Sequence, residues 1–255
     1  MINIGRCDKK MEIIGHRGAS FIAPENTLSS VNLAWMMGSD GVEVDVHLSK
    51  DNKLVVIHDG STTRTAGIDL KVEESSSEEL RKLDVGIYKG AEFTGRKIPF
   101  LEEVIVTIPS GKKLFVEIKS HREILPILKK IIDASGKKSQ IVIIGFDLET
   151  MGKSKKLMPD IPTYWLRGSV EDEKTKKYLP HDPQWINLAK GENLDGLNVH
   201  FAGLTEGFSR QVKESGLKLY VWTVNDIDEA KRLQKLGVDG MTSDKPDFII
   251  NHLCK

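Results

Sequence analysis

Two acidic residues, Glu43 and Asp45, are separated by one position in the strand-like run of residues 41–47. Side chains alternate between the two faces of a strand, so both acids point to one face and the valines of the run point to the other. Carboxylates that share a face can bind a metal ion together. On its own, however, this spacing more often marks a strand whose acidic face is solvated.

A histidine follows on the next apolar run, which ends at His58 and Asp59. If Asp51 and Asn52 form a tight hairpin turn, antiparallel pairing places His58 opposite Val44, flanked by the two acids. This arrangement brings a titratable imidazole beside the carboxylates. The hairpin therefore predicts that metal ligands and an acid/base group converge.

A second histidine motif, Gly-His-Arg-Gly at residues 15–18, follows the first apolar run, and Pro-Glu-Asn-Thr at residues 24–27 then begins a helix. A histidine at the C-terminal end of a strand, beside an arginine, suits acid/base chemistry on a bound anion. Taken alone, His16 is more often a surface or core residue than a functional one. Its significance therefore depends on the other motifs.

The alternation of the acid pair recurs at residues 115–119, where Glu117 and Lys119 share a face. A salt bridge in the interior is the simpler interpretation. Three carboxylates on adjacent strands, however, repel one another unless a positive charge lies among them. We therefore predict a divalent cation at this cluster, and ligands that are all oxygens favour Mg²⁺ or Ca²⁺ over a structural zinc ion.

The length of 255 residues suits a single α/β barrel domain. Basic and acidic residues are equal at 37 each, so no overall charge attracts nucleic acid or an anionic membrane surface. Cys7 and Cys254 are the two cysteines, which fits a reducing compartment, although one bridge between the ends stays an alternative. Without a signal-like or membrane-spanning apolar run, we expect a cytoplasmic protein; a chain trimmed of its signal peptide would look the same.

Short apolar runs alternate with helical patterns, which predicts βα units and a parallel sheet. We expect eight parallel strands at residues 12–15, 42–46, 113–118, 140–144, 163–166, 195–199, 218–224 and 240–242, with a hairpin partner of the second strand at 54–57. Because the motifs cluster at several strand ends, a closed (β/α)₈ TIM barrel is favoured over an open doubly wound sheet. Residues 60–97 are too long for a simple loop, so we expect a small inserted lobe over the barrel mouth, within one domain of residues 1–255.

Taken together, the motifs resemble the glycerophosphodiester phosphodiesterase family. The similarity covers nearly the whole chain and lies in the order and spacing of His16-Arg17-Gly18, residues 24–27, Glu43-Val44-Asp45, His58-Asp59, residues 98–103, Glu117-Ile118-Lys119, residues 221–225 and residues 237–244. One position departs from the family pattern. Members often carry Ser-Phe after the fourth parallel strand, where this chain reads Gly145-Phe146-Asp147, so we expect a supporting hydroxyl to be absent there.

The resemblance implies a barrel that binds one divalent cation, Mg²⁺ or Ca²⁺, through Glu43, Asp45 and Glu117. It also implies that His16 and His58 are the general acid/base pair, and that Arg17 and Lys119 steady the phosphate. Trp222, at the end of the seventh strand, is expected to pack against the glycerol part of the substrate, although a buried tryptophan is more often part of the core.

We therefore expect a metal-dependent hydrolase that converts a glycerophosphodiester and water to sn-glycerol 3-phosphate and an alcohol, in glycerol and lipid metabolism. In this family the adjacent glycerol hydroxyl is thought to attack phosphorus and give a cyclic phosphate; direct attack by water is the alternative. Two other functions stay open. One is a lysophospholipase D-like phosphodiesterase, which would need a broad apolar mouth that the polar segment 73–89 disfavours. The other is a non-catalytic barrel that binds a phosphodiester or a metal.

Overall fold

The computed structural model of the chain describes residues 11–120 and 122–253. Within these residues, nine strands form one sheet: β1 Glu12–Gly15, β2 Gly41–Leu48, β3 Leu54–Val56, β4 Lys113–Ile118, β5 Ile141–Gly145, β6 Thr163–Arg167, β7 Gly196–His200, β8 Lys218–Trp222 and β9 Gly240–Ser243. These bounds agree with the predicted strands to within a few residues. The expectations for Cys7 and Cys254 concern positions outside the described residues.

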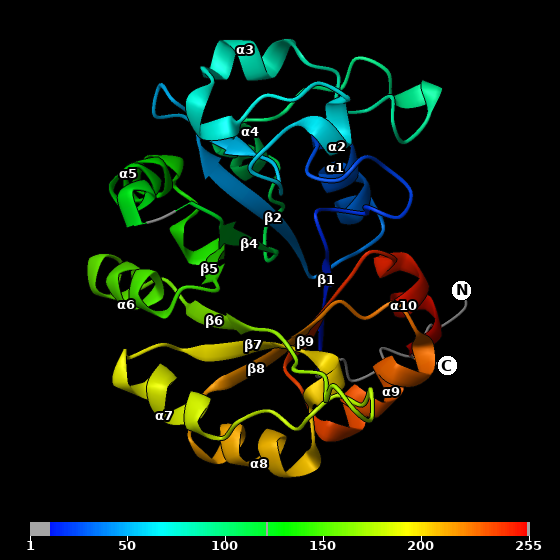
Figure 1. The fold of residues 1–255 in the computed structure, drawn as a ribbon, viewed down its shortest axis with the longest axis vertical. Helices are drawn as coiled ribbons and strands as arrows, with labels where there is room; N and C mark the ends of the chain where they lie inside the picture. The colour runs from blue at the N-terminus through cyan, green and yellow to red at the C-terminus, as the bar shows by residue number, and fades with distance from the viewer. Residues whose placement is uncertain (1–10, 121, 254–255) are drawn as a thin grey trace.

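The strands other than β3 form a closed parallel barrel, because β1 pairs with β9 on one side and with β2 on the other. Around the barrel they follow in chain order, with β3 antiparallel on the outer part of β2. Figure 1 looks roughly along the barrel axis and shows the helices placed around the strands. The predicted (β/α)₈ barrel is confirmed, and the open doubly wound sheet is excluded.

The helices that surround the barrel or belong to the segment after β3 are α1 Leu28–Met36, α2 Thr63–Ala66, α3 Ser77–Lys82, α4 Leu101–Val106, α5 Leu125–Ser135, α6 Leu148–Leu157, α7 Gln184–Gly191, α8 Glu206–Glu214, α9 Ile227–Leu236 and α10 Pro246–Leu253. Capping explains several of their ends. For example, the Asp226 side chain accepts from the backbone N–H of Glu229 at the start of α9, and Gly237, with φ of 71°, ends it. Within the described residues, no helix combines the length and apolar character needed to cross a membrane.

Two hydrophobic layers follow from strand alternation. The valines of β2 point outward into the large core between strands and helices, together with residues such as Leu128 of α5 and Leu233 of α9. The inward positions of the strands carry a separate cluster inside the barrel: Ile14, Phe115, Val142, Ile144, Tyr164, Leu166 and Tyr220. Because this inner layer fills the barrel, the inward residues nearer the carboxyl ends of the strands are left to line its mouth.

The hairpin after β2 has the predicted register. Val46 pairs with Val56, and the Ile57 N–H donates to the Asp45 carbonyl at 3.1 Å, which continues the pairing towards His58. The chain turns over residues 49–53, where Asn52 has φ of 59°. His58 therefore lies opposite Val44, on the same side of the barrel as the acids.

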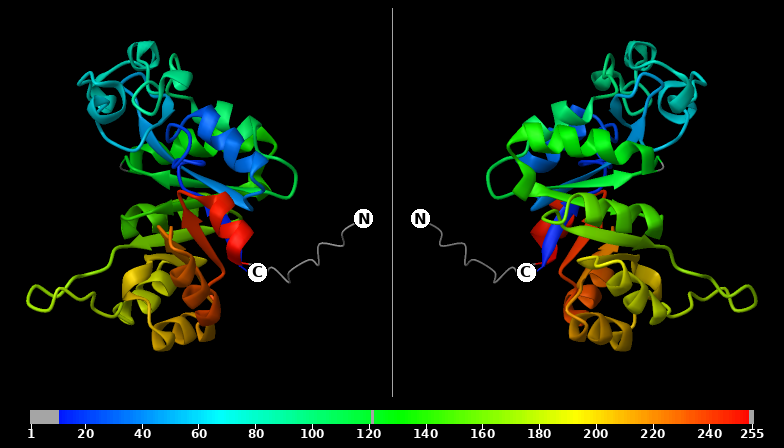
Figure 2. Two further views of the ribbon diagram at one scale, coloured as in Figure 1. Left: turned by 90° about the vertical axis from the view of Figure 1, so that its right-hand side faces the viewer. Right: turned by 90° about the vertical axis from the view of Figure 1, so that its left-hand side faces the viewer.

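Residues 60–97 carry α2, α3 and two short 3₁₀ helices, Val72–Glu74 and Ala91–Phe93. Their apolar side chains form a third small cluster with β3, which contains Val55, Ile57, Val72, Leu80, Val85 and Ile98. Figure 2 shows this segment and the loop between β6 and α7 projecting on the same side of the barrel. The loop before α7 leaves the carboxyl end of β6, and residues 60–97 follow β3, which pairs with the carboxyl-terminal part of β2, so both segments flank the barrel mouth.

The burial of His181, in the loop before α7, leads us to predict how the free energy of unfolding depends on pH. Its Nε2–H donates to the His200 carbonyl at 2.8 Å, and its ring packs between Trp185 and Phe208, with ring centroids 5.0 and 5.3 Å away. Burial lowers its pKa to about 4. Between this value and the ordinary pKa of about 6.5, the unfolded chain binds a proton that the folded chain does not.

The free energy of unfolding is therefore expected to rise as the pH increases from 4 to 6.5, with a contribution from His181 of about 2–3 kcal/mol over this range. Urea unfolding of the wild type and of His181→Gln at pH 4.5, 5.5 and 6.5 checks this. The variant keeps a donor but does not titrate, so its stability should vary less with pH. Equal pH dependence in the two proteins would contradict this role of His181.

Candidate active site

The predicted acid cluster lies inside the barrel, where β2 and β4 are neighbours. Their parallel register sets Asp45 beside Glu117, and strand alternation turns both acids of β2 inward. The three side chains are buried, with exposed fractions of 2% for Glu43, 1% for Asp45 and 8% for Glu117. One carboxylate oxygen of each lies within 4.8 Å of the other two, so the cluster could hold a metal ion.

Two cationic side chains contact the acid cluster. Lys119 Nζ lies 3.2 Å from Asp45 Oδ1 and 2.5 Å from Glu117 Oε1. Arg17 Nε lies 3.3 Å from Asp45 Oδ2, and the Arg17 backbone N–H donates to Glu43 Oε2 at 2.9 Å. The second oxygen of Glu43, Oε1, is buried without a hydrogen-bond partner among the described residues. Asp45 Oδ1 and Glu117 Oε1 also have no hydrogen-bond partner among these residues, but both form ion pairs with Lys119, whereas no ion pair is found for Glu43 Oε1 within the described part of the chain.

The pKa values of the acids reflect this shortage of positive charge. Burial raises the pKa of Glu43 well above its ordinary value, and the charges of Asp45 and Glu117 raise it further. Burial and the charge of Asp45 raise the pKa of Glu117 to about 7. Burial would also raise the pKa of Asp45, but Lys119 and Arg17 outweigh it and lower that pKa. A further cation at this position would favour the charged form of all three acids.

His16, directly after β1, is held by a carboxylate from the other end of the chain. Its Nδ1 lies 2.6 Å from Asp244 Oδ1. Asp244 also accepts from Ser20 Oγ at 2.9 Å and from Asn225 Nδ2 at 2.6 Å, and these donors, together with His16, keep its pKa low in spite of its burial. Asp244 belongs to the motif at residues 237–244, but its role was not predicted, because 228 positions separate it from His16.

His58, after β3, is held in the same way by its neighbour. Its Nδ1 lies 2.6 Å from Asp59 Oδ1, and Arg64 Nε donates to Asp59 Oδ2 at 2.7 Å. Burial would raise the pKa of Asp59, but Arg64 and His58 lower it to about 2. Burial lowers the pKa of His58, although Asp45 and Asp59 act in the other direction. A carboxylate on Nδ1 fixes each ring and leaves Nε2 as the nitrogen that can exchange a proton.

The motif at residues 24–27 holds the charged side chains of the site in place through hydrogen bonds. Glu25 accepts hydrogen bonds from Arg17 Nη1 at 2.8 Å and from both terminal nitrogens of Arg64. Asn26, in a left-handed conformation with φ of 56°, donates from Nδ2 to Asp45 Oδ2 at 2.8 Å and accepts from the Asp45 N–H at 3.1 Å. The motif therefore fixes the orientation of Asp45, a role that the sequence alone did not indicate.

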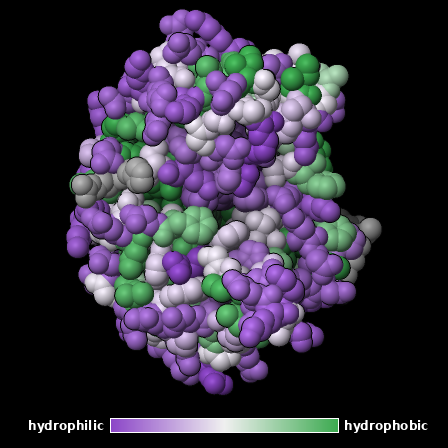
Figure 3. Space-filling view, viewed as in Figure 1, coloured by the Kyte–Doolittle hydropathy of each residue, from purple (hydrophilic) through white to green (hydrophobic). Residues whose placement is uncertain are grey.

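These groups surround a cavity of about 210 Å³ at the carboxyl ends of the strands. His16, Glu43, His58, Glu117 and Lys119 line one part of it, and Ile144, Phe146, Leu166, Asn198, Trp222, Thr223 and Thr242 line the rest. Figure 3 shows the molecule from the view of Figure 1, with a hollow near the centre of this face. Two of the predicted residues do not line this cavity: Asp45 is buried in contact with Lys119, and the Arg17 guanidinium contacts Glu25 and Asp45.

Trp222, which the sequence predicts to pack against the glycerol part of a substrate, lines the cavity. Its ring packs edge-on against Phe146, with centroids 5.7 Å apart, and its Nε1–H donates to the Asn198 carbonyl at 3.2 Å. Phe146 belongs to the segment that departs from the family pattern, and its ring lies 5.9 Å from Lys119 Nζ. Phe146 and Trp222 thus form an aromatic part of the cavity wall.

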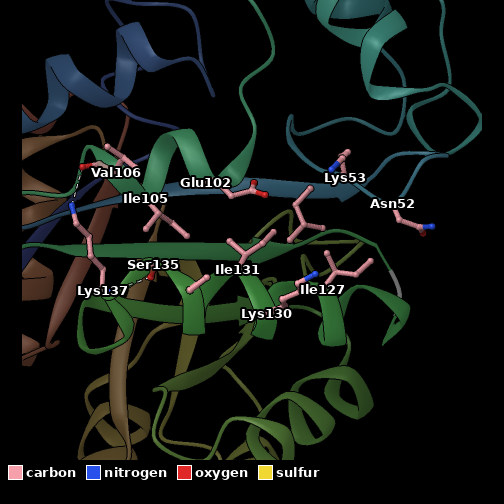
Figure 4. A pocket seen from close by; sticks show the side chains of 12 residues that line it. Asn52, Lys53, Glu102, Ile105, Val106, Ile127, Lys130, Ile131, Ser135 and Lys137 are labelled. Carbon is pink, nitrogen blue, oxygen red and sulfur yellow. Dashed lines mark hydrogen bonds between the residues drawn. The ribbon is translucent and has the colours of Figure 1, made fainter.

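A larger hollow lies on the outside of the barrel, between α4 and α5. It has a volume of about 650 Å³ and is lined mainly by apolar side chains such as Ile105, Val106, Ile127 and Ile131. Figure 4 shows these residues with Lys53, Lys130 and Lys137 at the edge and one acid, Glu102. It contains no histidine and no acid cluster, so the smaller cavity in the barrel mouth is the candidate for chemistry.

The fold and the site define a (β/α)₈ barrel enzyme, because the titratable groups from several strands converge at the carboxyl ends of the barrel. Comparison with known proteins is more specific. Residues 16–248 match the Glycerophosphoryl diester phosphodiesterase family. The chain belongs to this family and is a phosphoric diester hydrolase.

Individual relatives agree with this assignment. A glycerophosphodiester phosphodiesterase of Caldanaerobacter subterraneus subsp. tengcongensis is 34% identical over 251 residues, covering 95% of this chain and 97% of the relative. YhdW of Bacillus subtilis is 33% identical over 243 residues, covering 94% and 97%. Among solved structures, a phosphodiesterase of Oleispira antarctica in complex with the product sn-glycerol-3-phosphate matches with a TM-score of 0.87 at 28% identity, covering 96% of this chain and 97% of that one.

Proposed function

We propose that the protein hydrolyses glycerophosphodiesters to sn-glycerol 3-phosphate and an alcohol. The observation that carries this proposal is the convergence of three buried acids and two carboxylate-held imidazoles on one small cavity. The product named for the Oleispira antarctica phosphodiesterase, sn-glycerol-3-phosphate, supports the same substrate class.

A divalent cation, Mg²⁺ or Ca²⁺, is part of the proposal. Glu43, Asp45 and Glu117 would hold it, and the fit is supported by the unpartnered Oε1 of Glu43 and by a ligand set made of oxygens alone. When bound, such an ion offsets negative charge on the phosphoryl oxygens. Lys119, which now neutralises two of these acids, would then have its ammonium group available to a phosphate.

His16 and His58 are proposed as the acid/base pair. One imidazole takes the proton of the attacking hydroxyl, and the other gives a proton to the leaving alkoxide. Asp244 and Asp59 hold Nδ1 of the two rings, so Nε2 of each ring is the proposed site of proton transfer. The arrangement serves equally well for attack by the neighbouring glycerol hydroxyl and for attack by water.

Arg17 and Trp222 complete the proposed substrate site. Arg17 is held 2.8 Å from Glu25 and 3.3 Å from Asp45, so direct contact with a phosphate would require it to give up one of these pairs. Its charge can act on the phosphate across Asp45 without such movement. Trp222 offers its ring to the carbon atoms of the glycerol part.

A lysophospholipid is the second candidate substrate, because two apolar side chains beside His16 are exposed. Phe21 and Ile22 have exposed fractions of 58% and 45%, and the Phe21 N–H donates to the carbonyl of Asp244. A third exposed apolar side chain, Ile87, lies in the inserted segment of residues 60–97, which was expected to be polar between residues 73 and 89. An acyl chain could lie on such residues outside the cavity.

The purified protein with Mg²⁺ or Ca²⁺ is expected to release sn-glycerol 3-phosphate from glycerophosphocholine or glycerophosphoethanolamine, and EDTA should lower the rate by about 100-fold or more. A coupled assay for glycerol 3-phosphate measures this, and choline release from lysophosphatidylcholine tests the second candidate. Activity that resists EDTA would contradict the metal. No product from any of these diesters would contradict the substrate class and favour a binding protein.

A further inference from the structure

Asn198 occupies the side of the barrel mouth that lies across from the acid cluster. The barrel order places β7, which carries Asn198, opposite β2, which carries Glu43 and Asp45. Asn198 pairs with Leu166 and Tyr220 on the neighbouring strands, and both belong to the inner layer of the barrel. The Asn198 side chain therefore faces the interior, and it lines the same cavity as His16 and His58.

The amide of Asn198 has an unsatisfied polar atom. The residue is only 2% exposed, and its Oδ1 is buried without a hydrogen-bond partner among the described residues. Leaving a buried polar group unpaired is unfavourable for folding, and most such groups in native proteins have a partner. An amide in this position, aimed into a cavity, is therefore suited to a partner that enters with a ligand.

The surroundings indicate which part of a ligand this would be. Leu166, which pairs with Asn198, and Trp222, which donates to the Asn198 carbonyl, give this side of the cavity an apolar wall, whereas Lys119 contacts the acids. A phosphate would be drawn to the cationic side, so the group that reaches Asn198 is the neutral part of the molecule. An amide both donates and accepts hydrogen bonds, as a hydroxyl does.

The size of the cavity restricts this neutral part further. At about 210 Å³ the cavity is smaller than the 300–1,000 Å³ typical of sites that enclose a whole drug-sized ligand. It can enclose a phosphate with a three-carbon polyol, while a larger head group would extend through the open mouth. The glycerol half is common to all glycerophosphodiesters, so a fixed hydrogen-bonding group at this wall would serve every member of the class.

We propose that Asn198 is a specificity-determining residue that hydrogen-bonds a hydroxyl of the glycerol moiety, with Trp222 packed against its carbon atoms. This inference rests on the proposed function, because it takes the glycerol half of the diester as the part that enters the cavity. It assigns recognition of the hydroxyls to β7 and binding of the phosphate to the opposite side of the barrel.

The test compares sn-glycerol 3-phosphate with propyl phosphate, which has the same carbon chain and phosphate but lacks both hydroxyls. Both are used as competitive inhibitors and as calorimetric ligands of the protein with Mg²⁺ or Ca²⁺. The wild type is expected to bind sn-glycerol 3-phosphate at least about tenfold more tightly, since a site built to bond a hydroxyl discriminates against an analogue without it. In Asn198→Leu, which keeps the number and branching of the side-chain heavy atoms but not the polar atoms, the two affinities should agree within about twofold.

Asn187→Leu, an exposed asparagine on α7, is the matched control and should keep the wild-type preference. If Asn198→Leu still binds propyl phosphate, the variant is folded. If Asn198→Leu does not fold, Asn198→Ser is used in its place. A wild type without preference, or an Asn198 variant that keeps the full preference, overturns the inference. A wild type that prefers sn-glycerol 3-phosphate but releases none from any diester contradicts the proposed function instead, so the two failures are distinguishable.

Discussion

Replacing His16 or His58 by alanine is expected to lower kcat by about 10²–10⁴-fold while the affinity for the divalent cation is retained. Neither histidine belongs to the acid cluster, so the proposed metal ligands stay in place in both variants. Each ring is instead held by its own carboxylate, Asp244 for His16 and Asp59 for His58. The loss should therefore appear in proton transfer and not in metal binding.

The two histidines can be told apart with a substrate whose leaving group needs no proton. In a glycerophosphodiester of p-nitrophenol, the leaving group departs as the stable p-nitrophenolate anion. Removal of the general acid should therefore lower kcat much less for this substrate than for glycerophosphocholine. Removal of the general base should slow both substrates equally. The variant whose defect shrinks with p-nitrophenol therefore identifies the acid.

His252→Ala is the matched control for these measurements, because His252 is exposed on α10 and, within the described residues, its ring donates a hydrogen bond only to the Phe248 carbonyl. It should keep the wild-type kcat. Calorimetric titration with Mg²⁺ or Ca²⁺ checks that His16→Ala and His58→Ala still bind the ion. Full turnover by either variant would remove that histidine from the mechanism.

The alternation of apolar and charged residues along the strands of this chain is regular enough to predict the barrel and most of the acid cluster. Glu43, Asp45 and Glu117 each follow and precede apolar residues, so their orientation in a parallel barrel is set once β2 and β4 are neighbours. The hairpin register of His58 follows from the same counting. These features depend on local periodicity, which a sequence displays directly.

Features that depend on contacts between distant segments could not be predicted in this way. The pairing of His16 with Asp244 joins the first and last strands, which meet only because the barrel closes. The contacts of Arg17 are another example, because its left-handed backbone, with φ of 52°, turns its N–H to Glu43 while its guanidinium reaches Glu25 and Asp45. Such a conformation is uncommon outside glycine and leaves no periodic signal.

Asn198 illustrates a different limit. A single asparagine in the apolar run of β7 has no partner motif, so nothing in the sequence separates it from an ordinary strand residue. Its burial and its unpaired Oδ1 become visible only when the strands are placed in register around the cavity. The apolar wall around it likewise consists of residues that, one by one, suit a hydrophobic core.

Glu43→Gln is expected to abolish binding of the divalent cation and to lower turnover by about 10³-fold or more, because several kcal/mol of charge stabilisation would be lost with the ion. Glutamine has the same shape and can still accept the hydrogen bond of the Arg17 N–H, so the backbone around the site should be preserved. The substitution therefore removes a charge and a ligand while leaving the packing intact. Calorimetric titration of the ion and the coupled assay measure the two effects.

The same variant separates a metal site from a structural ion-pair network by its stability. In EDTA, Glu43→Gln should unfold at the same temperature as the wild type or higher, because it relieves repulsion among three buried acids that Lys119 and Arg17 only partly neutralise. Addition of the ion at about 100 times its Kd should stabilise the wild type by about 2.7 kcal/mol, which raises Tm by about 5–10 °C, and should leave the variant unchanged. Glu78→Gln, an exposed acid on α3, should behave as the wild type in both conditions. Because the stabilisation depends only on binding to the folded state, an equal rise in Tm for Glu43→Gln would place the ion away from this cluster.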